Sequence, residues 1–115
     1  MYKRQTFIYN KKDEVVENSK YDGSGTLISR SITDYNKFND KKEIVVFGPE
    51  NILMEKTLFT YDLFGRKTEE RTTNATGSQV RRITYVYDKK GSLTERTTFN
   101  ESNTIIAIKK YVYTY

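Results

Sequence analysis

The chain has 115 residues, enough for one domain, and its 20 Lys and Arg against 15 Asp and Glu give a formal net charge of +5. It contains no Cys and no His, which excludes a disulfide scaffold, a thiolate zinc site and the most common general base. Hydrophobic residues make up only 36%, too few for a thick core, while the 14% of aromatic residues is too many for a disordered chain.

The N-terminus reads differently from the rest of the chain. Met1-Tyr2-Lys3-Arg4-Gln5 matches the translation of a transposon-end sequencing adapter read from a GTG start. We therefore expect residues 1–5 to be a sequencing scar and residues 6–115 to be a fragment of a longer repeat array, the alternative being a native start. The longest apolar run, Ile105-Ile106-Ala107-Ile108, is far shorter than the ~18 residues of a transmembrane helix.

A repeat of 26 residues runs through the chain. It is carried by Tyr9, Tyr35, Tyr61, Tyr87 and Tyr113, and by Glu17, Glu43, Glu69 and Glu95. A second series, offset by 12 residues, is Tyr21, Phe47, Thr73 and Phe99. Each repeat thus has two related halves, and the predicted repeats span about 9–34, 35–60, 61–86 and 87–112.

Each half-repeat contains a predicted tight turn. Eight positions in phase hold only Gly, Asn or Asp, the residues that most readily adopt a left-handed backbone: Asp13, Gly25, Asn39, Asn51, Gly65, Gly77, Gly91 and Asn103. The pattern predicts β-hairpins closed by a type I turn followed by a left-handed residue. In Asp62–Gly65 and Asp88–Gly91, the Asp carboxylate is expected to accept hydrogen bonds from backbone N–H groups of its own turn.

The segments between turns are rich in Thr, Tyr, Ile and Val, as in 82–87 and 109–113. They predict an all-β fold, an antiparallel meander of about nine strands. The unequal halves stagger successive hairpins and predict a coiled open sheet, with a closed up-and-down barrel as the alternative. Charged residues expected on both faces favour the open form, because a narrow interior would desolvate them.

The predicted register places aromatic and acidic residues on one face. It pairs Thr73 with Gln79 and Glu69 with Ile83. The neighbours expected for the four glutamates are Phe7, Thr33, Phe59 and Tyr85.

One motif resembles a known family. Tyr87-Asp88-Lys89-Lys90-Gly91-Ser92-Leu93, followed by Thr94 and Glu95, resembles the YD repeat of bacterial RHS-type proteins. Residues 21–27 match through the Leu, and residues 61–66 match with Lys67 in the Leu position. The other copies are degenerate: Asn10 and Asn36 replace the Asp, and Thr73 replaces the aromatic.

The resemblance implies an extracellular or cell-surface location and neighbouring repeats as partners. In that family, large surface or secreted proteins wind such repeats into a hollow β-spiral shell, which in polymorphic toxins encloses a toxic domain. No self-cleaving segment or toxin domain is recognisable in this chain.

The resulting hypothesis is a non-enzymatic structural scaffold that needs no cofactor or metal. Glutamates two strands apart lie about 9.5 Å from each other, too far to share one small ion. One alternative is a carbohydrate or surface-polymer binding module that uses the tyrosine rim, defined as Tyr61, Tyr85, Tyr87, Tyr111 and Tyr113. A second alternative is an immunity or antitoxin-like repeat protein.

Two further expectations concern partners. Basic clusters scattered among acids predict no specific nucleic-acid partner. The edge strands near 6–9 and 105–113 predict edge-to-edge self-association.

Overall fold

The computed structural model describes residues 4–114, so Met1–Lys3 of the predicted scar lie outside the described residues. Within this range the strands are β1 (Arg4–Tyr9), β2 (Val15–Tyr21), β3 (Leu27–Tyr35), β4 (Lys41–Phe47), β5 (Leu53–Tyr61), β6 (Lys67–Asn74), β7 (Gln79–Tyr87), β8 (Leu93–Phe99) and β9 (Ile105–Lys110). Within residues 4–114, the one helical segment is a 3-10 turn, η1 (Pro49–Asn51). No helix in the described chain has the length and apolar character needed to cross a membrane.

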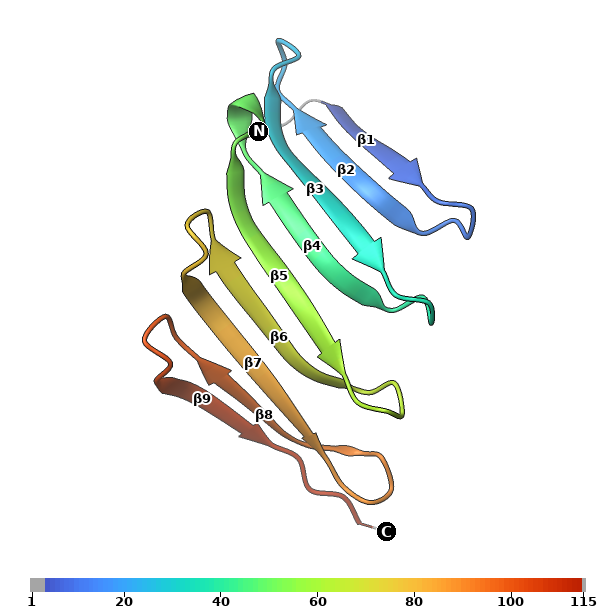
Figure 1. Ribbon diagram of the computed structural model, residues 1–115, viewed down its shortest axis with the longest axis vertical. Helices are drawn as coiled ribbons and strands as arrows, with labels where there is room; N and C mark the ends of the chain where they lie inside the picture. Colours follow the sequence, from blue (N-terminus) through green and yellow to red (C-terminus); the bar gives the residue numbers. More distant parts are fainter. Residues whose placement is uncertain (1–3, 115) are drawn as a thin grey trace. The chain divides into compact units, whose positions relative to one another are not determined.

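The strand order is the chain order, from β1 to β9, and the sheet is an open antiparallel meander (Figure 1). The all-β meander is therefore confirmed. The closed barrel is wrong, because β1 and β9 stand at opposite ends of the strand order. Coiling of the sheet stays a prediction. The chain divides into two compact units, an N-terminal unit, Met1–Lys56, and a C-terminal unit, Thr57–Tyr115.

The turns follow one backbone pattern. In the β5–β6 turn, the N–H of Gly65 donates to the carbonyl of Asp62 at 3.1 Å, and the N–H of Asp62 donates to the carbonyl of Arg66 at 2.9 Å. Gly65 has φ +80°, which a residue without Cβ adopts readily. All eight predicted turn positions have positive φ: Asp13, Gly25, Asn39, Asn51, Gly65, Gly77, Gly91 and Asn103.

The first residue of most turns adds a side-chain acceptor. Asp62 Oδ1 accepts from the backbone N–H groups of Phe64 at 2.9 Å and Arg66 at 3.0 Å. The same pair of bonds recurs at Asn10, Asp22, Asn36, Asn74, Asp88 and Asn100. The β4–β5 turn differs, because Gly48 has no side chain and Pro49 follows it. Short polar side chains thus fix the hairpins locally.

A second irregularity follows six of the turns. In the ladders β1–β2, β2–β3, β3–β4, β6–β7, β7–β8 and β8–β9, the register shifts by one residue close to the turn. The extra residues are Val16, Ile28, Lys42, Val80, Thr94 and Ile106. Thr73 pairs with Gln79 as predicted, but Glu69 pairs with Thr84, so the predicted partner Ile83 is wrong. The cause is the bulge, which moves every later pair by one residue.

The described residues form almost no core. Ile83, 6% exposed, is their one buried hydrophobic residue, and Ser19, Thr72 and Thr97 are their buried polar residues. Most other strand residues are half-buried. Hydrogen-bonded strands, rather than a packed interior, therefore hold each unit together, as the low hydrophobic content predicts.

Candidate functional site

The tyrosine rim belongs entirely to the C-terminal unit. Tyr61 and Tyr87 end β5 and β7, and Tyr111 and Tyr113 follow β9. Tyr85 lies two residues before Tyr87 and therefore faces the same side of the sheet. Tyr113 is 44% exposed, whereas Tyr61, Tyr85, Tyr87 and Tyr111 are half-buried.

The repeated tyrosines use their hydroxyl groups inside the sheet. Tyr87 Oη donates to the carbonyl of Lys67 at 2.6 Å, and Tyr113 Oη donates to the carbonyl of Leu93 at 2.7 Å. In the N-terminal unit, Tyr35 Oη donates to the carbonyl of Val15 at 2.8 Å. Each acceptor lies two residues after a turn residue with positive φ. The hydroxyl thus ties a strand end to the preceding hairpin.

The ring faces in the C-terminal unit carry cations. Lys67 Nζ lies 4.8 Å from the ring centroid of Tyr85, and the guanidinium carbon of Arg66 lies 4.9 Å from that of Tyr87. Lys109 Nζ lies 5.4 Å from the centroid of Tyr111. A sugar stacking on these faces would have to displace the cations. Burial raises the pKa of Tyr87 above its ordinary value.

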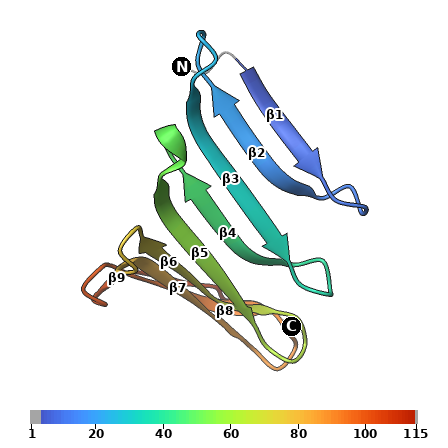
Figure 2. The same cartoon turned by 45° about the horizontal axis from the view of Figure 1, so that its top comes forward.

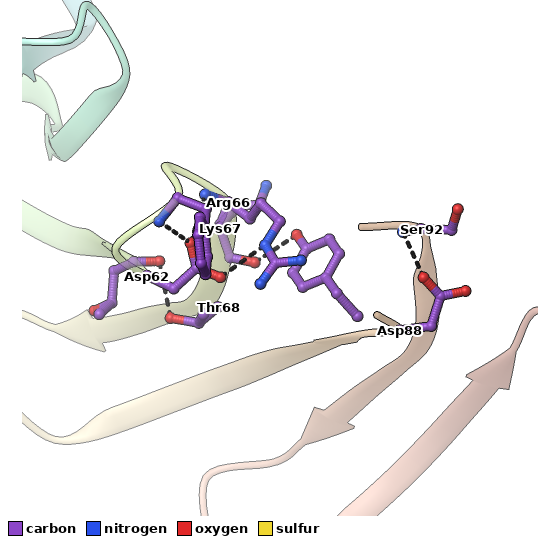
Figure 3. Close-up of polar contacts among 9 residues, drawn as sticks. Asp62, Arg66, Lys67, Thr68, Asp88 and Ser92 are labelled. Carbon is purple, nitrogen blue, oxygen red and sulfur yellow. Dashed lines mark hydrogen bonds and ion pairs between the residues drawn. The ribbon is translucent and has the colours of Figure 1, made fainter. Parts of the chain in front are cut away.

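Arg66 links the β5–β6 turn to its neighbours. Its Nε donates to Asp62 Oδ2 at 2.8 Å (Figure 3). Its guanidinium carbon lies 5.1 Å from the ring centroid of Phe64. The hydrogen bond from the backbone N–H of Arg66 is the main cause that lowers the pKa of Asp62. The Arg66 side chain and the backbone N–H of Phe64 lower it further, and together they outweigh burial, which alone would raise it. In the β7–β8 turn, the backbone N–H of Ser92 donates to Asp88 Oδ1 at 3.0 Å, as the backbone N–H of Arg66 does to Asp62 Oδ1 (Figure 3).

The adjacent Lys67 is held by an acid. Lys67 Nζ donates to Glu70 Oε1 at 2.6 Å. Burial alone would lower the pKa of Lys67, but Glu70 and the nearby Tyr85 outweigh it and raise the pKa overall. The cations at the rim are therefore engaged within the protein.

The glutamate series does not share a face with the tyrosine rim. Glu95 pairs with Val86 and Glu69 with Thr84, so both lie on the face opposite Tyr85. Glu17 pairs with Ile8 instead of Phe7, and Glu43 pairs with Asp34 instead of Thr33. The predicted shared face and these predicted neighbours are wrong, because the prediction omitted the bulge after each turn.

A basic series pairs with the glutamates. The ion pairs are Arg30–Glu17 at 3.5 Å, Lys56–Glu43 at 3.9 Å and Arg82–Glu69 at 3.3 Å. Their cations are also spaced by 26 residues, a signal visible in the sequence. Ile108 holds the next position of that series, and Glu95 instead pairs across strands with Lys110. No three carboxylates converge on a metal-ligand cluster within residues 4–114.

The N-terminal unit has a shallow polar pocket that the sequence reasoning missed. It measures about 320 Å³ and is lined by Asn10, Lys11, Lys12, Glu14, Tyr35, Asn36 and Asn39. Asn10 Nδ2 donates to Glu14 Oε1 at 2.9 Å, and Lys12 Nζ donates to Asn39 Oδ1 at 2.7 Å. These groups hold two turns together. The sequence signal available for this pocket was the presence of Asn instead of Asp at positions 10 and 36.

The fold defines a class of protein: a single antiparallel meander of repeated hairpins, in which side chains that recur with the repeat bond to the sheet itself. No family model matches the chain, and no curated protein matches it. The chain is similar to the crystal structure of a protein with unknown function from Bacteroides fragilis, with a TM-score of 0.59 and 14% sequence identity. The match covers 95% of this chain and 93% of that chain. At this identity the likeness concerns the fold alone.

Proposed function

We propose that the chain is a non-enzymatic, structural β-repeat scaffold segment of a larger bacterial surface or secreted RHS-type protein. The observation that carries the proposal is the use of the periodic side chains. Tyr35, Tyr87 and Tyr113 each bond to a backbone carbonyl, and the Asp and Asn residues bond to their own turns. A repeat whose period serves sheet geometry propagates structure from one hairpin to the next.

The edge strands support the same proposal. All six residues of β9 are exposed, including Ile105 at 51%, Ile106 at 60% and Ile108 at 50%. On β1, Phe7 is 45% and Ile8 is 53% exposed. Apolar edge strands template further pairing, and in this proposal neighbouring repeats supply it. Part of a toxin-enclosing shell is one such setting.

The carbohydrate-binding alternative has less support. A stacking platform needs accessible ring faces, and here cations lie over Tyr85, Tyr87 and Tyr111. The immunity-like alternative depends on whether the gene stands alone, which sequencing of the flanking DNA decides.

The discriminating experiment combines a glycan array with Tyr87→Phe and Tyr87→Ala. A scaffold predicts no glycan binding by the wild-type chain and a lower melting temperature for both variants. Tyr87→Phe keeps the ring beside Arg66 and removes only the hydroxyl bond. Glycan binding that Tyr87→Ala abolishes while the circular dichroism spectrum persists would instead establish recognition and overturn the scaffold proposal.

A further inference from the structure

The two ends of each unit differ in the residues at their hairpin tips. Successive turns of a meander lie at alternate ends (Figures 1 and 2). At one end, here called the lysine end, the two central turn residues are Lys11-Lys12 and Lys37-Phe38 in the N-terminal unit, and Leu63-Phe64 and Lys89-Lys90 in the C-terminal unit. At the other end, the small-residue end, they are Gly23-Ser24 and Pro49-Glu50, and Ala75-Thr76 and Glu101-Ser102.

The apolar tips of the lysine end are unusually exposed. Leu63 is 102% exposed, Phe64 is 83% exposed and Phe38 is 68% exposed. The turn geometry does not require them, because Ala75-Thr76 occupies the same positions in a turn with the same backbone bonds. Leu63 and Phe64 are adjacent in one turn and form a contiguous exposed apolar pair, which is the feature expected of an interaction surface.

The charge at these tips is positive. Lys12 donates to the neutral amide of Asn39, and Lys37 Nζ lies 5.2 Å from the ring centroid of Phe38, so neither contact neutralises the lysine. In the C-terminal unit, the acids of these two turns, Asp62 and Asp88, stand one residue before the tips. Asp62 is bound by Arg66 and two backbone N–H groups.

We propose that the lysine end of the C-terminal unit docks on an anionic phospholipid bilayer. Leu63 and Phe64 enter the headgroup region, where their apolar surface leaves water, and the tip lysines lie against lipid phosphates. A soluble polyanion would satisfy the lysines but would give the leucine and phenylalanine no apolar environment. Docking goes beyond the scaffold role, because it gives the repeat a direction relative to a surface.

The chain contains no Trp, so a single introduced Trp reports its own environment. Phe64→Trp probes the lysine end, and Thr76→Trp is the matched control at the small-residue end. With vesicles of equal parts phosphatidylcholine and phosphatidylglycerol, we expect a blue shift and quenching by brominated lipid for Phe64→Trp only. Phosphatidylcholine vesicles should leave both spectra unchanged. Absence of a shift for Phe64→Trp, or equal shifts for both variants, would overturn the proposal.

Vesicle sedimentation separates the two contributions. Lys89→Gln should weaken partitioning about fivefold, and Leu63→Ser combined with Phe64→Ser at least about tenfold. All are exposed tip positions, so melting temperatures should not change. If the serine variant binds like wild type and DNA competes fully with the vesicles, the surface binds polyanions and the bilayer proposal is wrong. Tyr87→Phe should leave vesicle binding unchanged, which keeps this test independent of the scaffold test.

Discussion

Tyr87 donates its hydroxyl to the carbonyl of Lys67 at 2.6 Å, which fixes the end of β7 to the first residue of β6. The same bond, between residues 20 positions apart, joins Tyr35 to Val15 and Tyr113 to Leu93. Tyr35, Tyr87 and Tyr113 are therefore ties between successive hairpins, and their period follows from that role.

Removing the tie should destabilise each unit separately. Tyr35→Phe and Tyr87→Phe should each reduce the free energy of unfolding by about 1 kcal/mol, the usual worth of one hydrogen bond. Because the two bonds lie in different units, their effects should add in the double variant. Urea denaturation measures both. Tyr9→Phe is the control, since Tyr9 is 56% exposed and no hairpin of the described chain precedes it. A loss as large for Tyr9→Phe would contradict the tie.

The Asp turns should make stability sensitive to acid. The hydrogen bond from the backbone N–H of Thr26 is the main cause that lowers the pKa of Asp22. The hydrogen bond from the backbone N–H of Arg66 is the main cause that lowers the pKa of Asp62. Because these folded pKa values lie below 3.8, the carboxylates stabilise the fold above that pH and lose this contribution as the pH falls through the folded values. Urea midpoints between pH 7 and pH 2 measure it.

Asp62→Asn is the matched variant for this prediction. It retains an Oδ1 acceptor, as natural Asn does in the turn at position 36, but cannot titrate. We expect a shallower acid limb for Asp62→Asn and, at neutral pH, a lower melting temperature for Asp62→Ala, which removes the acceptor. An unchanged acid limb in Asp62→Asn would show that other carboxylates cause the acid sensitivity.

The left-handed turn positions should discriminate between Ala and Asn. Gly77 has φ +86°, and a Cβ built there meets no atom within 4 Å, so backbone strain alone sets the effect of a substitution. Gly77→Ala should cost about 1–2 kcal/mol, whereas Gly77→Asn should cost clearly less, because Asn39 and Asn103 occupy the same position elsewhere. Equal losses in chemical denaturation would argue against strain as the cause.

The exposed edge of β9 should promote self-association. Ile106 is 60% exposed and is the extra residue of the β8–β9 bulge. Ile106→Lys should reduce association seen by light scattering at rising concentration, because an edge charge disfavours strand pairing. Thr76→Lys adds the same charge in a hairpin turn away from β9 and should have little effect. A wild-type chain that stays monomeric at all concentrations would exclude edge pairing.

Turn chemistry made much of the fold predictable. Gly, Asn or Asp at eight phased positions located the hairpins, and the strands between them lie close to the predicted segments. The faces were not predictable from the turns alone. The bulge residues, such as Val16, Lys42 and Thr94, share no residue type, so the sequence carried no local signal for the one-residue shift.

The candidate site was predicted less well. The rim tyrosines were located by their period, but their hydroxyl acceptors are backbone carbonyls, which no sequence motif reveals. The pairing of Glu69 with Arg82 was hidden by the register error, although both series share the period. Leu63 and Phe64 were treated as ordinary turn residues, since exposure at a tip becomes informative only when both ends are compared.

The near absence of a core, with Ile83 as the one buried hydrophobic residue described, has an evolutionary consequence. A gene duplication that inserts another 26 residues lengthens the sheet without forcing any interior to repack, and a whole repeat, with its own turns and bulges, preserves which side each residue faces. Such a chain can change its length in whole repeats while mutations at each tip accumulate independently, so its size and its surface chemistry are free to evolve separately.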